Sequence, residues 1–235
     1  MGNELKERLS HVFWMGGSPS SGKSSIATVL AEAYDIRVYH VDEAFDNHRE
    51  RVTPAEQPML LKWMTTPWNE LWMRPVSVLL KEAIAYHEEL FDMILDDLLS
   101  LAGRKPILVE GTSLLPERVH ELLSGRQQAL WVIPTDRFQK AQYADRGAWV
   151  EGLLRECDNP ERVFINWMDR DLAFTKWMTA QISGLGLAYI EVDGKRSVAE
   201  NAGVAARHFG LVKGLVPAPR RHNGGMRAAL GSLSR

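Results

Sequence analysis

The feature that most constrains the fold is an eight-residue segment near the N-terminus. Residues 17–24 read Gly-Ser-Pro-Ser-Ser-Gly-Lys-Ser and match the pattern G-x-x-x-x-G-K-[ST] at every specified position. The apolar run 12–15 precedes the segment and predicts a buried strand, and apolar residues at helical spacing follow it over 26–33. The sequence therefore predicts a strand, a glycine-bearing loop and a helix in direct succession.

This loop pattern predicts a site for the phosphates of a nucleotide. Backbone N–H groups of such a loop point inward, and the helix that follows adds the positive end of its dipole. Lys23 would place its charge on the β- and γ-phosphates, and the Ser24 hydroxyl would bind Mg²⁺. We expect the nucleotide to be bound by Gly17, Ser18, Pro19, Ser20, Ser21, Gly22, Lys23, Ser24 and Ser25.

Length and composition agree with a globular enzyme. The chain has 235 residues, of which 45% are hydrophobic and 25% charged, enough for one large α/β domain. The net charge of −2 argues against a general nucleic-acid or membrane binder. The single cysteine, Cys157, allows no internal disulfide and suits a reducing compartment. We expect a cytoplasmic protein, since no signal-peptide pattern and no membrane-length apolar run is present.

Strand-like and helix-like segments alternate along the chain, which predicts a parallel sheet covered by helices on both faces. The expected strands are short runs rich in β-branched or aromatic residues. They cover about 11–16, 36–41, 107–109, 129–133 and 187–192.

Two segments are too long to be simple crossovers. We expect a helical insert over about 46–104 to bind the acceptor substrate, with a long helix over 75–101. After the fourth strand, residues 135–157 are expected to form a lid, followed by a helix over about 160–182. The predicted domain spans 1–213. The remaining residues, 214–235, are rich in glycine, proline and arginine and predict a flexible basic tail.

The chain resembles the P-loop small-molecule kinases, a superfamily that includes nucleoside-monophosphate kinases, shikimate- and gluconate-type kinases and chloramphenicol-type phosphotransferases. The resemblance rests on the loop 17–24, the Val-Asp-Glu end of strand two at 41–43, Val-Glu-Gly at 109–111 and an arginine-bearing segment after strand four. It implies a three-layer α/β P-loop NTPase fold with about five parallel strands, an insert after strand two and a lid after strand four. The Asp-Gly-x-Pro-Arg segment of true nucleoside-monophosphate kinases is absent at 110–116, which favours another small acceptor.

The resemblance and the positions of charged residues indicate further site residues. Asp42, at the end of strand two, would orient the acceptor hydroxyl and take its proton, or instead cap the next helix. Glu110 would hold Mg²⁺ through water, or bond a backbone turn. Arg146 and Arg137 occupy the expected lid, where arginine forks would grip phosphate oxygens or form surface ion pairs.

For other residues near these positions, the sequence favours a structural role over a functional one. Trp63, Trp68 and Trp72 would form either a stacking wall for an aromatic acceptor or, more simply, ordinary core packing. Asp46 and His48 are two metal-ligand types without a third, so we expect them to be polar surface residues.

Phosphoryl transfer that depends on ATP and Mg²⁺, to a small hydroxyl- or phosphate-bearing molecule, is the function this sequence favours. Catalysis of this kind needs positioning and charge stabilisation, which the expected residues would supply. A nucleoside or nucleotide kinase and a regulatory NTP-binding module remain alternatives. A GTPase is not favoured, because the Asn-Lys-x-Asp segment that reads guanine is missing. The sequence leaves the acceptor, the preferred base and the oligomeric state open.

Overall fold

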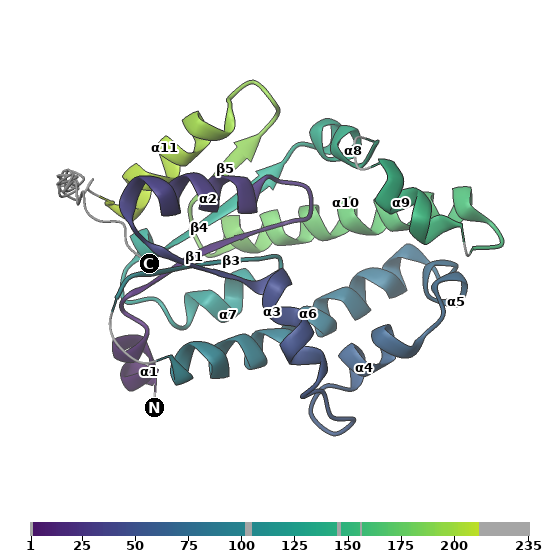
Figure 1. The fold of residues 1–235 in the computed structure, drawn as a ribbon, viewed down its shortest axis with the longest axis horizontal. Helices are drawn as coiled ribbons and strands as arrows, with labels where there is room; N and C mark the ends of the chain where they lie inside the picture. Colours follow the sequence, from purple (N-terminus) through teal and green to yellow (C-terminus); the bar gives the residue numbers. More distant parts are fainter. Residues whose placement is uncertain (1, 102–104, 145–146, 156, 212–235) are drawn as a thin grey trace, which may run out of the picture.

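A five-stranded sheet forms the centre of the part of the molecule that the structure describes (Figure 1). The computed structural model describes residues 2–101, 105–144, 147–155 and 157–211. The strands lie in the order β2-β3-β1-β4-β5, and every neighbouring pair is parallel. They are β1 (Val12–Gly17), β2 (Arg37–His40), β3 (Ile107–Glu110), β4 (Ala129–Pro134) and β5 (Tyr189–Val192). The five parallel strands expected from the sequence are thus confirmed.

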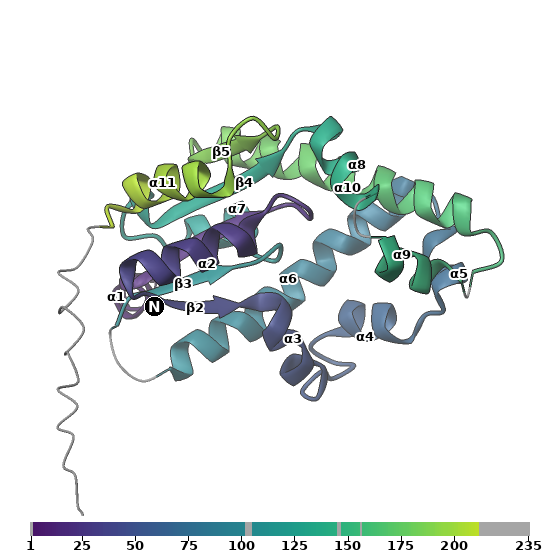
Figure 2. The same cartoon turned by 45° about the horizontal axis from the view of Figure 1, so that its top comes forward.

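Helices cover both faces of the sheet (Figures 1 and 2). On one face lie α2 (Lys23–Tyr34) and α11 (Val198–Phe209); on the other lie α6 (Val76–Ser100), α7 (Pro116–His120) and α10 (Pro160–Gly184). Successive residues of β1 serve the two faces in turn, with Trp14 in one core and Met15 in the other. Because both faces are covered, the inner strands are apolar apart from Glu110 at the end of β3, as the sequence indicated.

Between β2 and β3, the described residues form four helices. They are α3 (Val41–Arg49), α4 (Pro58–Thr65), α5 (Trp68–Trp72) and α6. Pro58 occupies the first turn of α4, where its missing N–H costs nothing, and Pro67 precedes α5. The long α6 closely matches the helix expected over 75–101. Figure 2 shows α4 and α5 beside the part of α6 that extends beyond the sheet.

The segment after β4 is also helical. It comprises α8 (Asp136–Ala144), α9 (Gly147–Leu154) and the long α10. The Asn159 side chain caps α10 by accepting a hydrogen bond from the backbone N–H of Arg162 at 3.0 Å, and the helix confirms the one expected over 160–182. A third apolar cluster, including Trp72, Tyr143 and Trp167, joins α5, α8 and α10 away from the sheet. Among the described residues, the remaining helices are α1 (Gly2–Arg8) and the 3-10 turn η1 (Arg126–Gln128).

Two local expectations around strand two were wrong. The strand ends at His40, and Val41 and Asp42 begin α3, where acidic side chains in the first turn complement the helix dipole. His48 is not a surface residue: it is fully buried, and its Nε2 lies 2.8 Å from Asp97 Oδ2 on α6. The physical reason is that α3 packs against α6 and turns His48 inward.

Candidate functional site

The loop between β1 and α2 has a conformation that only certain residues allow. Gly17 has φ of 144°, and a Cβ atom there would lie 2.1 Å from the carbonyl oxygen of Val132 on β4. Gly22 has φ of 85° and occupies the N-cap of α2. Ser20, with φ of 61°, also lies in the left-handed region. The two glycines of the motif are therefore explained by backbone geometry.

The same loop presents unpaired polar groups. No side chain caps the N-terminus of α2, so the N–H groups of its first turn stay available at the positive end of the helix dipole. The hydroxyl oxygens of Ser18 and Ser20 are buried without a hydrogen-bond partner. Buried polar atoms normally have partners, so these groups fit a bound anion such as a nucleotide phosphate. We refer to residues 17–24 below as the phosphate loop.

Lys23 is held across the mouth of this loop. Its Nζ lies 3.0 Å from the carbonyl oxygen of Ser18, and 3.5 Å from both Ser21 Oγ and Thr112 Oγ1. The side chain is buried except for 8% of its surface, which fixes its charge beside the loop. Thr112 lies two residues after the end of β3, so segments that follow two neighbouring strands of the sheet orient the same ammonium group.

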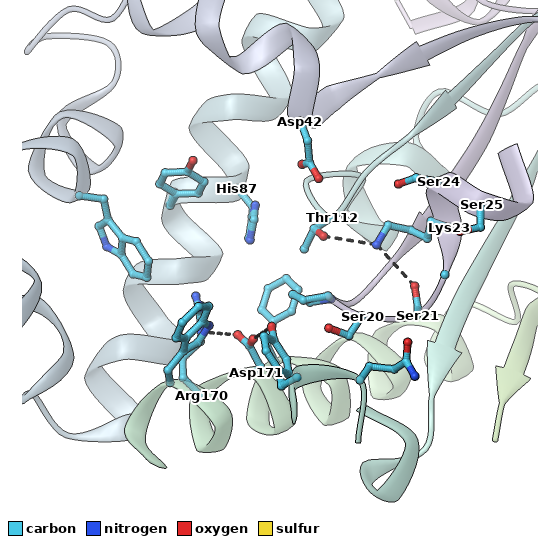
Figure 3. Close-up of a pocket in the computed structure, with 18 residues that line it drawn as sticks. Ser20, Ser21, Lys23, Ser24, Ser25, Asp42, His87, Thr112, Arg170 and Asp171 are labelled. Carbon is cyan, nitrogen blue, oxygen red and sulfur yellow. Dashed lines mark hydrogen bonds and ion pairs between the residues drawn. The ribbon is translucent and has the colours of Figure 1, made fainter. Parts of the chain in front are cut away.

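A cavity of about 770 Å³ extends from the phosphate loop into the helical part of the molecule (Figure 3). Its walls come from the loop and α2 on one side, and from α3, α4, α6, α8 and α10 on the others. The lining residues are Pro19, Ser20, Ser21, Gly22, Lys23, Ser24, Ser25, Asp42, Trp63, Tyr86, His87, Thr112, Gln142, Tyr143, Trp167, Arg170, Asp171 and Phe174.

Asp42 lies in this cavity, as the sequence indicated. It stands in the first turn of α3, and Figure 3 shows its carboxylate directed toward the space beside Thr112. The pKa of Tyr86 is raised by burial and further by the nearby negative charge of Asp42. Asp42 and the phosphate loop therefore share one cavity.

The other predicted carboxylate and the two predicted arginines are placed differently. Glu110 is buried at the end of β3, and its Oε1 lies 2.7 Å from Nδ1 of His40 on the adjacent strand. Arg137 is exposed near the start of α8. Neither side chain lines the cavity. Arg146 and the basic tail 214–235 lie outside the described residues.

Several cavity residues were not anticipated from the sequence, and the most informative are Arg170 and Asp171 on α10. Arg170 Nε lies 2.7 Å from Asp171 Oδ1, and the Tyr143 hydroxyl donates a hydrogen bond to Asp171 Oδ2. The Arg170 guanidinium also stands over the rings of Trp72 and Trp63, at 4.8 and 5.3 Å from their centroids. Figure 3 shows this pair across the cavity from the phosphate loop.

His87 on α6 is a second unanticipated wall residue. Its Nδ1 is 2.8 Å from Ser113 Oγ, and its ring lies 5.1 Å from that of Phe174. Burial lowers the pKa of His87 to about 3, with a further contribution from the charges of Arg170 and Lys23. The imidazole is therefore neutral near pH 7.

The three tryptophans of the insert divide between the two alternatives. Trp63, on α4, lines the cavity. Trp72 is buried in the third apolar cluster and stacks on Trp167, with ring centroids 5.5 Å apart. Trp68 packs on the same two rings without lining the cavity.

The polar groups near the loop fit Mg²⁺ bound together with a nucleotide. Ser24 offers a hydroxyl and Asp42 a carboxylate on the cavity wall. Across the described residues, no three His, Cys, Asp or Glu side chains gather as a metal site. Mg²⁺ commonly takes one or two protein oxygens and completes its shell with phosphate and water, so the sparse donor set is compatible with it.

Comparisons with known proteins add little. No protein-family model matches the chain, and no curated protein matches it. Among solved structures, the chain is similar to shikimate kinase from Acinetobacter baumannii in complex with shikimate, at 13% identity and a TM-score of 0.48. The match covers 83% of this chain and 90% of that one. These values are too low to bear on activity or substrate. In the part of the chain that the structure describes, no helix has the length and apolarity to cross a membrane.

Proposed function

We propose that the protein transfers a phosphoryl group from ATP, with Mg²⁺, to a small hydroxyl- or phosphate-bearing acceptor. The observation that carries this proposal is the shared cavity, which has a phosphate loop at one end, Asp42 on its wall and a ring-lined space beyond. A nucleotide held by the loop would direct its terminal phosphate into that space. The small-molecule acceptor would bind there.

Each residue has a definite part in this scheme. The loop N–H groups and Lys23 would bind the phosphates and stabilise the charge that develops during transfer. Ser24 would hold Mg²⁺, which neutralises phosphate charge when bound. Asp42 would orient the acceptor hydroxyl and accept its proton.

Three earlier assignments remain part of the proposal. Glu110 would support the metal through water, and its bond to His40 would fix the carboxylate's orientation. Arg146 would reach the transferred phosphate when a lid over about 135–157 closes, and Arg137 would assist from α8 once the lid has moved. The proposed setting is cytoplasmic.

A regulatory NTP-binding module is the main alternative from another class. Such a module needs a phosphate loop but no acceptor space. The extension of the cavity to Trp63, Arg170 and Phe174 favours the kinase instead, because this space lies beyond the loop. A nucleoside or nucleotide kinase is the alternative within the same class.

The proposal can be tested by measuring ADP formation from Mg·ATP, with and without a panel of sugars, nucleosides, antibiotics and acidic metabolites. We expect ADP production that depends on one added acceptor and disappears in Lys23→Ala. Lys81→Ala, an exposed substitution on α6, is the matched control and should retain activity. A folded Lys23→Ala protein with unchanged ATP affinity by calorimetry would remove the basis of the proposal. ADP release that no acceptor stimulates would favour the regulatory module.

A further inference from the structure

The part of the cavity farthest from the phosphate loop is built mainly from aromatic rings, and its charges are largely compensated. We call it the ring chamber and define it by Trp63, Tyr86, His87, Tyr143, Trp167, Arg170, Asp171 and Phe174. We propose that the ring chamber accepts an electrically neutral, hydroxylated compound with a flat ring, and discriminates against acceptors that carry a carboxylate or phosphate. This inference rests on the proposed function, because it specifies the acceptor class of the same site.

The only cation that the ring chamber contributes from the described residues already has partners. Arg170 pairs with Asp171 at 2.7 Å, and its guanidinium faces the rings of Trp63 and Trp72. The contact with Asp171 is an ion pair made through Nε, and it compensates the charge of the guanidinium before any substrate binds. Here a carboxylate from the next residue on the same helix already neutralises the charge.

The neighbouring groups do not favour an anion either. His87 is neutral near pH 7, because its lowered pKa follows from burial and from the charges of Arg170 and Lys23. Asp42 adds a carboxylate where the acceptor meets the phosphate loop. The charged side chains that line the described cavity, Lys23, Asp42, Arg170 and Asp171, sum to zero, and Lys23 lies at the phosphate loop rather than in the ring chamber. An acceptor anion would lose its water shell without gaining an unpaired cation.

The rings offer a favourable surface to a flat, uncharged molecule. The ring centroids of Trp63 and Tyr86 lie 5.5 Å apart on the side of α4 and α6. The ring centroids of Tyr143 and Trp167 lie 5.5 Å apart on the side of α8 and α10. Phe174 on α10 and His87 on α6 complete the wall, with their ring centroids 5.1 Å apart. A ring stacked among these side chains would bury apolar surface, while its hydroxyl would be directed toward Asp42.

The test compares matched pairs of probes that differ in charge. The pairs are thymidine with thymidine 5′-monophosphate, and methyl 4-(hydroxymethyl)benzoate with 4-(hydroxymethyl)benzoate. Binding is measured by calorimetry on the full chain, with and without saturating Mg·AMP-PNP. In at least one pair we expect the neutral member to bind with a Kd at least about tenfold lower than its anion.

Two variants connect this preference to the proposed residues. Trp63→Leu should weaken binding of the neutral probe by about tenfold or more. Trp68→Leu removes another half-buried ring that lies outside the cavity, so it should leave binding of the probe unchanged. Asp171→Asn keeps an acceptor for the Tyr143 hydroxyl but releases the charge of Arg170, so it should improve binding of the anionic probe by about tenfold. Asp169→Asn, an exposed neighbour on α10, is the control.

The possible outcomes separate this inference from the proposed function. Anions that bind as well as or better than their neutral partners would overturn the inference, as would failure of every probe to bind at about 10 mM. Either result is compatible with phosphoryl transfer if Mg·AMP-PNP itself binds. Failure of Mg·AMP-PNP to bind the wild-type protein would count against the proposed function, while a neutral preference measured without nucleotide would still support the ring chamber.

Discussion

Gln139 on α8 donates a hydrogen bond from its Nε2 to the carbonyl oxygen of Pro19 in the phosphate loop, at 3.0 Å. The Oε1 atom of the same side chain accepts a hydrogen bond from Thr175 on α10 at 3.1 Å. Gln139 is almost completely buried. One amide therefore joins the loop to the helix that carries Arg170 and Asp171.

Replacing Gln139 by leucine should affect both stability and nucleotide binding. The change leaves the half-buried Pro19 carbonyl without its donor, which we expect to cost about 1 kcal/mol of unfolding free energy. We also expect roughly tenfold weaker Mg·AMP-PNP binding, measured by calorimetry, because the loop loses its attachment. Lys140→Leu alters the next, exposed residue and should change neither quantity. Equal nucleotide affinities in wild type and Gln139→Leu would show that the bond only holds helices together.

The contrast between the phosphate loop and the ring chamber explains how far the sequence could predict this site. The loop is local: its glycines, Lys23 and the flanking strand and helix lie within one continuous segment, so a pattern identifies them. Arg170 and Asp171 lie on a helix with buried residues on several sides, because α10 packs on the sheet and on α6 at once. No periodicity shows which side faces the cavity, and only the tertiary arrangement brings them to Trp63.

The end of strand two was mispredicted for a related reason. The β-branched run that reaches Val41 favours continued strand, but two acids at the start of α3 favour a helix N-terminus. The helix forms, and Asp42 still reaches the cavity because β2 and β1 end at the same edge of the sheet. The position of a residue at a strand end was thus a better guide than its assigned conformation.

Gly17→Ala should destabilise the fold. A methyl group at this position would meet the Val132 carbonyl oxygen at 2.1 Å, and φ of 144° is strained for any L side chain. We expect a loss of about 3 kcal/mol or more in urea unfolding, since backbone of β4 can move little inside the sheet. Gly152→Ala is the control, because nothing lies within 4 Å of a Cβ atom there and alanine favours the helix. A Gly17→Ala protein as stable as wild type would mean that this strand pairing is wrong.

His87 should make the protein less stable in acid. Its pKa of about 3 in the folded state lies below the ordinary value of 6.5, so between these values the unfolded chain binds the proton and the folded protein does not. His87 therefore lowers the free energy of unfolding as the pH falls from about 6.5 toward about 3. His87→Gln keeps a group that can bond Ser113 but cannot titrate.

We expect wild type to lose more unfolding free energy than His87→Gln between about pH 7 and about pH 4.5, as measured by urea denaturation. Parallel pH profiles for the two proteins would contradict the neutral state of this imidazole.

Asp42→Asn should reduce turnover far more than nucleotide affinity. Asp42 lies in the cavity on α3, whereas in the proposed scheme the loop and Lys23 would bind the phosphates, so ATP binding should persist. Loss of a general base typically lowers the rate by about 10²–10⁴-fold. The measurement is kcat at saturating ATP and acceptor, together with the Kd for Mg·AMP-PNP. Glu43→Gln is the matched control, since Glu43 is the next residue of α3, is exposed and does not line the cavity. If Asp42→Asn instead loses nucleotide binding and keeps its rate at saturation, Asp42 serves the metal and nucleotide, and another group must take the acceptor's proton.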